Sequence, residues 1–404
     1  MFLKKILKNQ LIVILVFFVI NVALLYSNFG FYSFARYNPR PEFWDLYNTT
    51  GLWNCYKAVG LDLFLSTPSP LDVCRNFNYG YFSILSMGLT TSIYSSIKFW
   101  GFLQIMVFVF LVVRIYFRDN FMHKKGIYSL ALFSPGIFLL YTSGNMDIQI
   151  ICLLLIANQF IVSGKEKSGI TLICITALLK FYTAPILLII VLIVKRKNSR
   201  AYGLMLIFFT AFIILYQLIK TPPTAFPDGA QNKFGSGIFD NYARKAGIPM
   251  SKLQGDFLGM IFLFVVLLLI IFCYKKLSNL NSNPLVKLTN NEELLAVNFL
   301  IMAGISIVCY LAALNVDYRL TFIALAGIAL LSLPELKVKY ISSVFPYVWL
   351  LSLWIVFPFA DFKKYIGLDL QPLGDFFMIG TIAYFIFQGF YIFTNLKRNY
   401  KSLK

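Results

Sequence analysis

The sequence predicts an all-α protein, a polytopic bundle of about 11–13 transmembrane helices that forms one integral membrane domain over residues 1–404. Of these residues 59% are hydrophobic and 13% are charged, and the mean hydropathy is +0.74. Soluble domains carry about 25% charged residues, so this chain has too few to cover a globular surface. Its apolar residues come in blocks of about 15–22, a length that crosses the bilayer core as a helix.

The apolar blocks indicate the order of the helices along the chain. Three lysines precede the first block, which has no convincing cleavage site and is expected to remain as an uncleaved anchor. The expected helices cover about 11–27, 99–117, 127–141, 148–162, 169–180, 185–194, 202–218, 257–274, 295–314, a segment ending before residue 334, 344–357 and 376–393. Two long outer loops, 28–98 and 220–256, separate some of them, and residues 80–96 are expected to lie along the outer membrane interface.

The distribution of charge predicts the orientation of the bundle. The formal net charge is +19, with 36 Lys and Arg residues. Roughly 22 of these fall in the shorter loops on one side of the predicted bundle, which the positive-inside rule assigns to the cytoplasm. The sequence therefore predicts a multi-pass cell-membrane protein with both termini cytoplasmic. No basic stripe carries interleaved aromatics, so the lipid bilayer is the expected partner and nucleic acid is not.

The six cysteines and the single histidine, His123, form no metal-binding spacing, and neither a metal nor another cofactor is expected. Four cysteines lie inside apolar blocks, where they are expected to pack as small side chains: Cys152, Cys174, Cys273 and Cys309. Cys55 and Cys74 fall in the first outer loop. They are able to form a disulfide if that compartment is oxidising, and whether they do stays open.

Four polar clusters are expected at the outer face, where ionisable groups near membrane depth are costly and usually functional. The first cluster follows the first helix and contains Glu42, Trp44, Asp45 and Tyr47. A carboxyl group that aromatic neighbours partly desolvate has a raised pKa, in the range useful for a general base. The alternative is a solvated Asp45 beside aromatic residues that anchor the loop at the lipid interface.

The second and third clusters lie between predicted helices. Gly144 and Asn145 suit a tight turn, after which Asp147 either caps the next helix or, with Asn145, binds sugar hydroxyls. Lys180 ends one apolar run, Tyr182 follows it, and a proline opens the next run. Lys180 either holds a phosphate as a point charge or extends its amine to the membrane surface.

The fourth cluster consists of Asp317, Tyr318 and Arg319. Arg319 either pairs with Asp317 or grips a phosphate in a bidentate manner. Cations, carboxylates and aromatic rings on one face suit a phosphate-bearing lipid together with a hydroxylated acceptor. We therefore expect Asp45, Lys180 and Arg319 to share one water-facing pocket at the outer edge of the bilayer.

Four short motifs follow one another along the chain: Asp45 in a long outer loop, Asn78-Tyr79-Gly80-Tyr81-Phe82, Gly144-Asn145-Met146-Asp147 and Leu179-Lys180-Phe181-Tyr182. Over nearly its whole length the chain thereby resembles the GT-C superfamily of membrane glycosyltransferases. It is most similar to family 87 and related polyprenol-phosphate-mannose-dependent mannosyltransferases. The second Asp of the family's Asp-x-Asp form is absent, as are the prolines expected after Tyr79, and these departures leave the sugar and the acceptor open.

The resemblance implies an inverting glycosyltransferase with a GT-C-like fold. Its donor is a sugar, such as mannose, on a polyprenyl phosphate, and its acceptor is a glycan or glycolipid at the outer face. Asp45 is implied as the general base, with Lys180, Tyr182 and Arg319 at the donor phosphate. The sugar and the acceptor are implied to contact the other residues of the four clusters: Glu42, Trp44, Tyr47, Asn145, Asp147, Asp317 and Tyr318.

Two other functions remain open. A polysaccharide polymerase of the O-antigen type also has many helices and long outer loops. It relies on Arg-rich outer loops, of which Arg244 beside Lys245 is only a hint. A lipid or sugar transporter shows ionisable residues in mid-helix and inverted repeats. This sequence has few charges inside its apolar blocks and no visible repeat, which disfavours a transporter.

Overall fold

The structure is a computed structural model. It describes residues 97–117, 125–132, 144–220, 251–278, 288–311, 320–333, 341–355 and 371–402, together with 134, 136–137, 140–141 and 249. The first predicted helix, the predicted interfacial segment and most of both long outer loops lie outside these residues, and so do Cys55 and Cys74. Within the described residues the regular structure is helical, without a strand.

The helices follow the predicted order along the chain. They are α4 (Ile97–Tyr116), α5 (Lys125–Leu132), α7 (Asp147–Val162), α8 (Glu166–Leu179), the 3-10 helix η4 (Phe181–Thr183), α9 (Ala184–Ile193), α10 (Lys197–Lys220), α12 (Lys252–Ser278), α13 (Asn290–Leu311), α14 (Leu320–Leu331), α15 (Ile341–Ile355) and α17 (Gln371–Ser402). α4 matches the helix expected at 99–117, and α7 matches the one expected at 148–162. α10, α12 and α17 extend beyond their apolar blocks into the polar flanks.

One expected helix is wrong. The sequence predicts a continuous helix over 127–141, but α5 ends at Leu132 and residue 134 forms a bend, while residues 136–137 and 140–141 are helical. Pro135 stands at this break. Proline has no N–H to donate and disfavours helical geometry in the preceding residue, so it overrides the apolar pattern.

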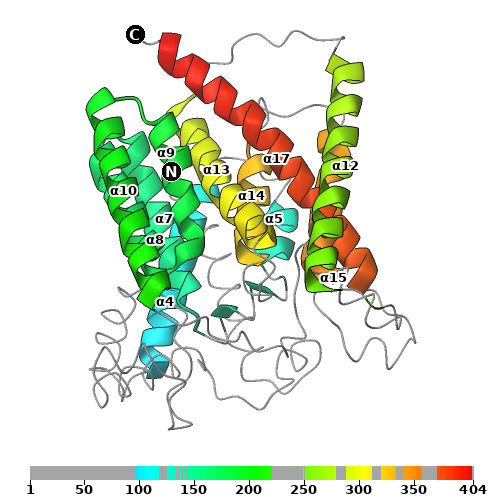
Figure 1. Ribbon diagram of the computed structural model, residues 1–404, viewed down its shortest axis with the longest axis horizontal. Helices are drawn as coiled ribbons and strands as arrows, with labels where there is room; N and C mark the ends of the chain where they lie inside the picture. Colours follow the sequence, from blue (N-terminus) through cyan, green and yellow to red (C-terminus); the bar gives the residue numbers. More distant parts are fainter. Residues whose placement is uncertain are drawn as a thin grey trace, which may run out of the picture.

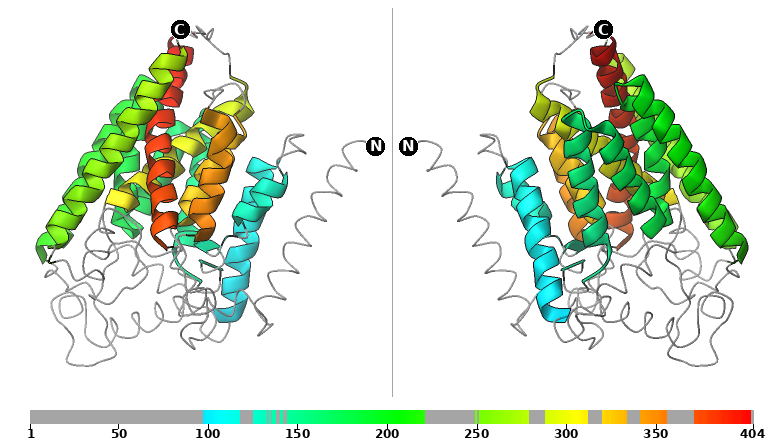
Figure 2. Two further views of the ribbon diagram at one scale, coloured as in Figure 1. Left: turned by 90° about the vertical axis from the view of Figure 1, so that its right-hand side faces the viewer. Right: turned by 90° about the vertical axis from the view of Figure 1, so that its left-hand side faces the viewer.

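Two sets of helices flank a central pair, α13 and α14 (Figure 1). On one side α7, α8, α9 and α10 pack together, while on the other side α12 and α15 pack on α17. The central α13 contacts α7, α9, α14 and α17, and it thereby joins the two sets. The side views show most of the long helices running between the same two ends of the molecule (Figure 2).

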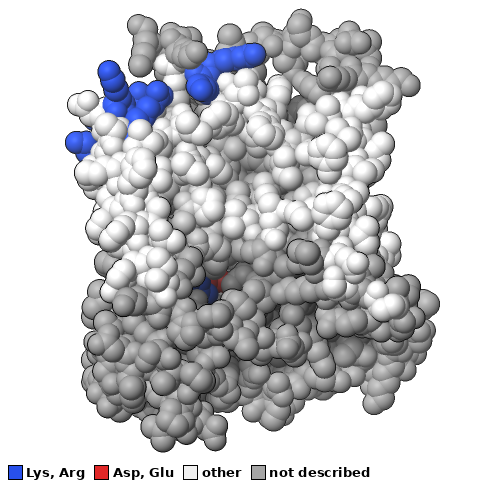
Figure 3. Space-filling view, viewed as in Figure 1, with Lys and Arg blue, Asp and Glu red and all other residues white. Residues whose placement is uncertain are grey.

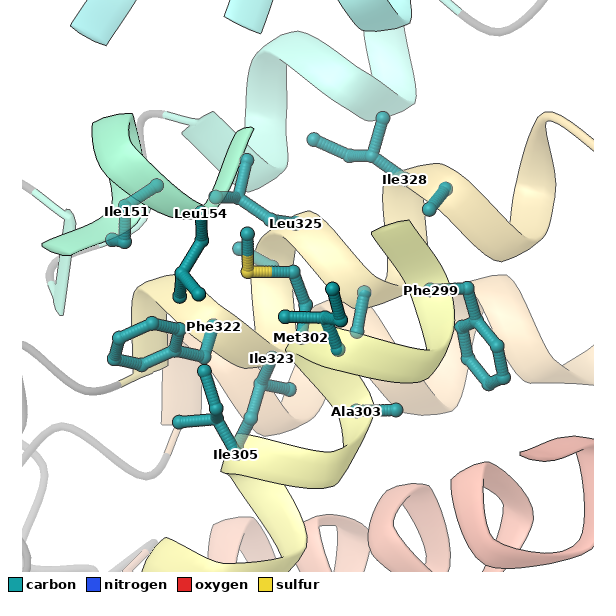
Figure 4. Packing of buried hydrophobic residues seen from close by; sticks show 14 of the residues in the cluster. Ile151, Leu154, Phe299, Met302, Ala303, Ile305, Phe322, Ile323, Leu325 and Ile328 are labelled. Carbon is teal, nitrogen blue, oxygen red and sulfur yellow. The ribbon is translucent and has the colours of Figure 1, made fainter. Parts of the chain in front are cut away.

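The core lies where α13 meets α14 and α7 (Figure 4). α14 is buried at every position, as expected for a short helix that is apolar all round. The packed side chains of the three helices include Ile151, Leu154, Phe299, Met302, Ala303, Ile305, Phe322, Ile323, Leu325 and Ile328. The expected burial of cysteines is confirmed for Cys152, Cys174 and Cys309, whereas the side chain of Cys273 lies outside the description.

The outer helices expose apolar side chains to the surroundings. On α10, Phe208 is 75% exposed and Ile219 is 74% exposed, and α12 exposes Phe264 and Phe272 in the same way. Soluble monomers rarely leave so large an apolar surface open. Four of the described helices are long and apolar enough to cross a membrane: Phe99–Tyr116, Lys197–Tyr216, Asn290–Leu311 and Leu373–Arg398. These features are those of a helical membrane protein.

Candidate functional site

The α7–α8 hairpin brings two distant parts of the sequence together. α7 and α8 pack along each other and are joined by a short turn at 163–165. In this turn Gly164 has φ +83°, a left-handed conformation that glycine adopts without strain. The start of α7 and the end of α8 therefore lie at the same end of the bundle, which we call the Lys180 end.

Lys180 turns the chain out of α8. The helix ends at Leu179, and Lys180 is extended, with φ −144° and ψ 120°. Its N–H still donates to the carbonyl of Thr176, which completes the last helical turn. The chain then passes through η4 into α9, whose first turn holds Pro185. Proline is tolerated there because N–H groups of a first turn have no acceptor within the helix.

Four side chains meet at this end, and we call them the Lys180 cluster: Asn145, Asp147, Lys180 and Tyr182. Nζ of Lys180 lies 2.5 Å from Oδ1 of Asp147 and donates to Oδ1 of Asn145 at 3.0 Å. The hydroxyl of Tyr182 donates to the same oxygen of Asp147 at 2.5 Å. The side chain of Asp147 is 0% exposed and that of Lys180 is 5% exposed, so the ion pair is withdrawn from water.

Two structural interpretations of these residues are wrong. Asp147 is the first residue of α7, as expected, but its side chain makes no capping hydrogen bond. The N-cap residue is Met146, which makes no side-chain capping bond, and Oδ1 of Asn145 accepts the N–H of Asp147 at 3.0 Å. Lys180 does not extend to the membrane surface, because it is buried in its ion pair. Asn145 therefore satisfies a helix N–H, and the Asp147 carboxylate is used across the hairpin.

Burial raises the free-energy cost of keeping Asp147 and Lys180 charged. Desolvating a carboxylate and an ammonium is costly, and their attraction and additional hydrogen bonds must offset that cost. Asn145 and Tyr182 supply such hydrogen bonds, and the dipole of α7 favours a carboxylate at its first residue. Oδ2 of Asp147 is buried and has no hydrogen-bond partner among the described residues. This oxygen therefore keeps an unused acceptor position inside the protein.

The remaining predicted site residues lie outside the described part of the chain: Glu42, Trp44, Asp45, Tyr47, Asp317, Tyr318 and Arg319. Their place in a common pocket with Lys180 stays a prediction. One contact bears on the region, because the ring of Tyr182 meets Phe322 edge-on with centroids 5.9 Å apart. Phe322 follows Arg319 closely in the sequence, so the start of α14 lies beside the Lys180 cluster.

Two further buried polar residues were not singled out from the sequence. Asp375, near the start of α17, is 3% exposed, and Tyr310, in the last turn of α13, is 0% exposed. The two groups interact electrostatically. The sequence offers one sign of the buried Asp375: this carboxylate stands at the edge of an apolar block, directly before the predicted helix at 376–393.

The opposite end of the bundle, which we call the basic end, carries a second polar network. Lys195 pairs with Glu293 at 2.8 Å and lies over the ring of Tyr400, whose hydroxyl donates to Glu293 at 2.6 Å. Burial first, and the Glu293 carboxylate second, raise the pKa of Tyr400, so this phenol remains a hydrogen-bond donor. Glu166 accepts the backbone N–H groups of Lys195 and Arg196. These contacts hold α8, α13 and α17 together.

Within the residues that the structure describes, no group of three or more His, Cys, Asp or Glu side chains is placed to hold a metal ion. Comparison of the chain with family models, with curated proteins and with solved structures gives no match.

Proposed function

We propose that this chain is a GT-C-like membrane glycosyltransferase. It transfers a sugar, a hexose such as mannose, from a polyprenyl-phosphate donor to an acceptor glycan or glycolipid. The observation that supports the proposal most is the buried Lys180 cluster. The cluster combines a cation that suits a phosphate with a carboxylate oxygen that suits a hydroxylated ring.

The charge distribution supports one orientation in the membrane. Lys and Arg gather at the basic end, above α10 and along the end of α17 (Figure 3). The positive-inside rule assigns such an end to the cytoplasm. The Lys180 cluster then faces the outer side of a multi-pass cell-membrane protein whose two termini are inside. A polyprenyl phosphate keeps its phosphate at the membrane surface and its tail in the bilayer, so a polar site at the helix ends suits it.

The proposed reaction is a direct displacement. Asp45 takes the proton of the acceptor hydroxyl while the hydroxyl oxygen forms a new bond to the anomeric carbon. The bond between that carbon and the phosphate oxygen breaks, and polyprenyl phosphate leaves with the bonding electron pair. Attack from the face opposite the leaving group inverts the anomeric centre. Lys180 and Arg319 stabilise the negative charge on the phosphate by preorganised electrostatics.

Asp147 has two roles in this proposal. Its Oδ1 fixes Lys180 and Tyr182 on one side of the site. Its Oδ2 accepts a hydrogen bond from a hydroxyl of the sugar. Asn145 is a positioning residue, because its Oδ1 accepts hydrogen bonds from both the N–H of Asp147 and the ammonium of Lys180.

The helix interiors distinguish this proposal from a transporter. Transporters place ionisable residues near mid-helix, along the substrate path. In the described part of the chain, the buried Asp, Glu and Lys residues lie at or near helix ends: Asp147, Glu166, Lys180, Glu293 and Asp375. Such residues suit a site at the membrane surface more than a path through it.

The test is a transfer assay with the purified full chain and a panel of polyprenyl-phosphate hexoses. Asp45→Asn is expected to abolish sugar transfer while membrane expression stays normal. Asp62→Asn, in the same predicted outer loop, is the matched control and should keep the wild-type rate. Retained transfer in Asp45→Asn removes that residue from the catalytic role. Absence of transfer from every donor of the panel contradicts the proposed function.

A further inference from the structure

A cationic surface lies at the basic end of α8 and α10. The segments 163–168 and 194–200, which include the first residues of α8 and α10, contain six basic residues and one acidic residue, Glu166. Glu166 is 3% exposed and its carboxylate is occupied by backbone N–H groups, while Lys195 is paired with Glu293. Five basic residues are left, and we call them the α8–α10 basic surface: Lys165, Lys167, Arg196, Lys197 and Arg200.

The positive charge of this surface is not neutralised within the described part of the chain. The ion pairs formed there are those of Lys180 and Lys195, and the five residues of the α8–α10 basic surface have no acidic partner in it. Two of these residues also make contacts within the protein. Nε of Arg200 donates to the carbonyl of Val194 at 2.9 Å, and Nζ of Lys167 lies 5.8 Å from the ring centre of Tyr202.

An apolar stripe continues from this surface along α10. Its side chains recur every three or four residues and are between 47% and 75% exposed: Leu204, Phe208, Phe212, Leu215 and Ile219. That spacing places them on one face of the helix. Gly203 and Thr210 are buried on the other face. The stripe begins one turn after Arg200, so the positive charge and the apolar surface are continuous, and Figure 3 shows blue atoms above a white surface on this side.

We infer that this surface binds an anionic phospholipid. The phosphate of the headgroup lies on the α8–α10 basic surface, and an acyl chain lies along the apolar stripe of α10. α10 is apolar enough to cross a membrane, so lipid chains lie along its exposed stripe. A neutral lipid covers this stripe but leaves the adjacent charges unpaired. Only an amphiphile with an anionic head satisfies both features. The inference does not depend on the proposed sugar transfer.

The test titrates the full chain in detergent micelles with dioleoyl phosphatidylglycerol and measures bound lipid by native mass spectrometry. Dioleoyl phosphatidylcholine is the neutral comparison and is expected to bind at least tenfold more weakly. The double variant Lys167→Gln with Lys197→Gln is expected to weaken phosphatidylglycerol binding about 30-fold, since each exposed cation contributes about fivefold. Lys167→Arg with Lys197→Arg keeps the charge and should keep the binding.

The matched control is Lys397→Gln with Arg398→Gln, which removes the same charge at the same end but on α17. It is expected to bind phosphatidylglycerol as the wild type does. An equal loss in this control means that general charge attraction, and not this surface, holds the lipid. Equal binding of the two lipids overturns the inference, and so does soluble glycerol 1-phosphate that binds as tightly as the lipid. A melting curve for each variant confirms that it is folded.

Discussion

Nζ of Lys180 lies 2.5 Å from Oδ1 of Asp147, although 33 positions separate the two residues in the sequence. The ion pair joins the first residue of α7 to the residue that ends α8. Both side chains are buried, so each charge depends on the other for its stabilisation. This relationship links the stability of the Lys180 end to the site proposed there.

Asp147→Asn is expected to destabilise the protein strongly. The change leaves the ammonium of Lys180 buried without its carboxylate, and breaking a buried ion pair typically costs about 3–5 kcal/mol. Thermal unfolding in detergent measures the loss as a fall in Tm. Lys180→Met should cause a comparable fall, because it leaves the Asp147 carboxylate uncompensated.

The double variant Asp147→Asn with Lys180→Met is the control for this prediction. It removes both charges at once, so neither is left unpaired. Its Tm should therefore fall by less than the sum of the falls in the two single variants. If the two losses simply add, the residues are not coupled and the ion pair does not explain the stability.

Tyr182→Phe is expected to weaken both stability and sugar transfer. The change removes the hydroxyl that donates to Asp147 but keeps the ring against Phe322. A hydrogen bond to a charged group contributes about 1.5–3 kcal/mol, and that of the partly buried Tyr182 should lie at the lower end. A loss of about 1.4 kcal/mol in the transition state lowers the transfer rate about tenfold.

Tyr202→Phe is the matched control for Tyr182→Phe. It also removes a tyrosine hydroxyl, which is 2.9 Å from the hydroxyl of Thr171, but at the basic end. This variant should transfer sugar at the wild-type rate. Equal rates in the two variants would exclude a specific role of the Tyr182 hydroxyl in the site.

Gly327→Ala is expected to disturb the packing of α14 on α15. A Cβ at this position would come within 2.1 Å of Cε2 of Trp349. The indole is buried and donates to the carbonyl of Ile323 at 3.0 Å, so it cannot move without losing that hydrogen bond. Overpacking of this kind costs about 1–3 kcal/mol, measured as a lower Tm.

Gly380→Ala provides the comparison for Gly327→Ala. On α17 the nearest atom to the added Cβ is Cγ1 of Val348 at 3.8 Å, an ordinary contact. Alanine is the better helix former by about 1 kcal/mol, so this variant should keep or raise Tm. Similar Tm values for the two variants would show that the close contact with Trp349 does not destabilise Gly327→Ala.

Asn158→Leu is expected to destabilise the contact between α7 and α13. Nδ2 of Asn158 donates to Oδ1 of Asn298, and both side chains are fully buried. The single change leaves the Asn298 amide without this partner in an apolar core, at a cost of about 1–3 kcal/mol. Asn158→Leu with Asn298→Leu removes both polar groups and should recover most of the lost Tm. A single variant as stable as the wild type would contradict the prediction.

Several helix bounds could be predicted because the length of an apolar block is a local property. α4 at Ile97–Tyr116 and α7 at Asp147–Val162 match the blocks at 99–117 and 148–162. The break after α5 is also local, but the apolar pattern runs across Pro135 without interruption, so periodicity alone does not reveal it. The burial of Asp375 depends on how α17 packs, which no local pattern reports.

By itself, the sequence determined that the described chain is helical and strongly apolar, since composition and block length depend on no contact between distant residues. Only the tertiary structure decided how the polar side chains of the Lys180 end are used. Asp147 was equally able to cap its own helix, and Lys180 to reach the membrane surface. The packing of α7 against α8 withdrew both groups from water, and pairing is then the arrangement of lowest free energy open to two opposite charges.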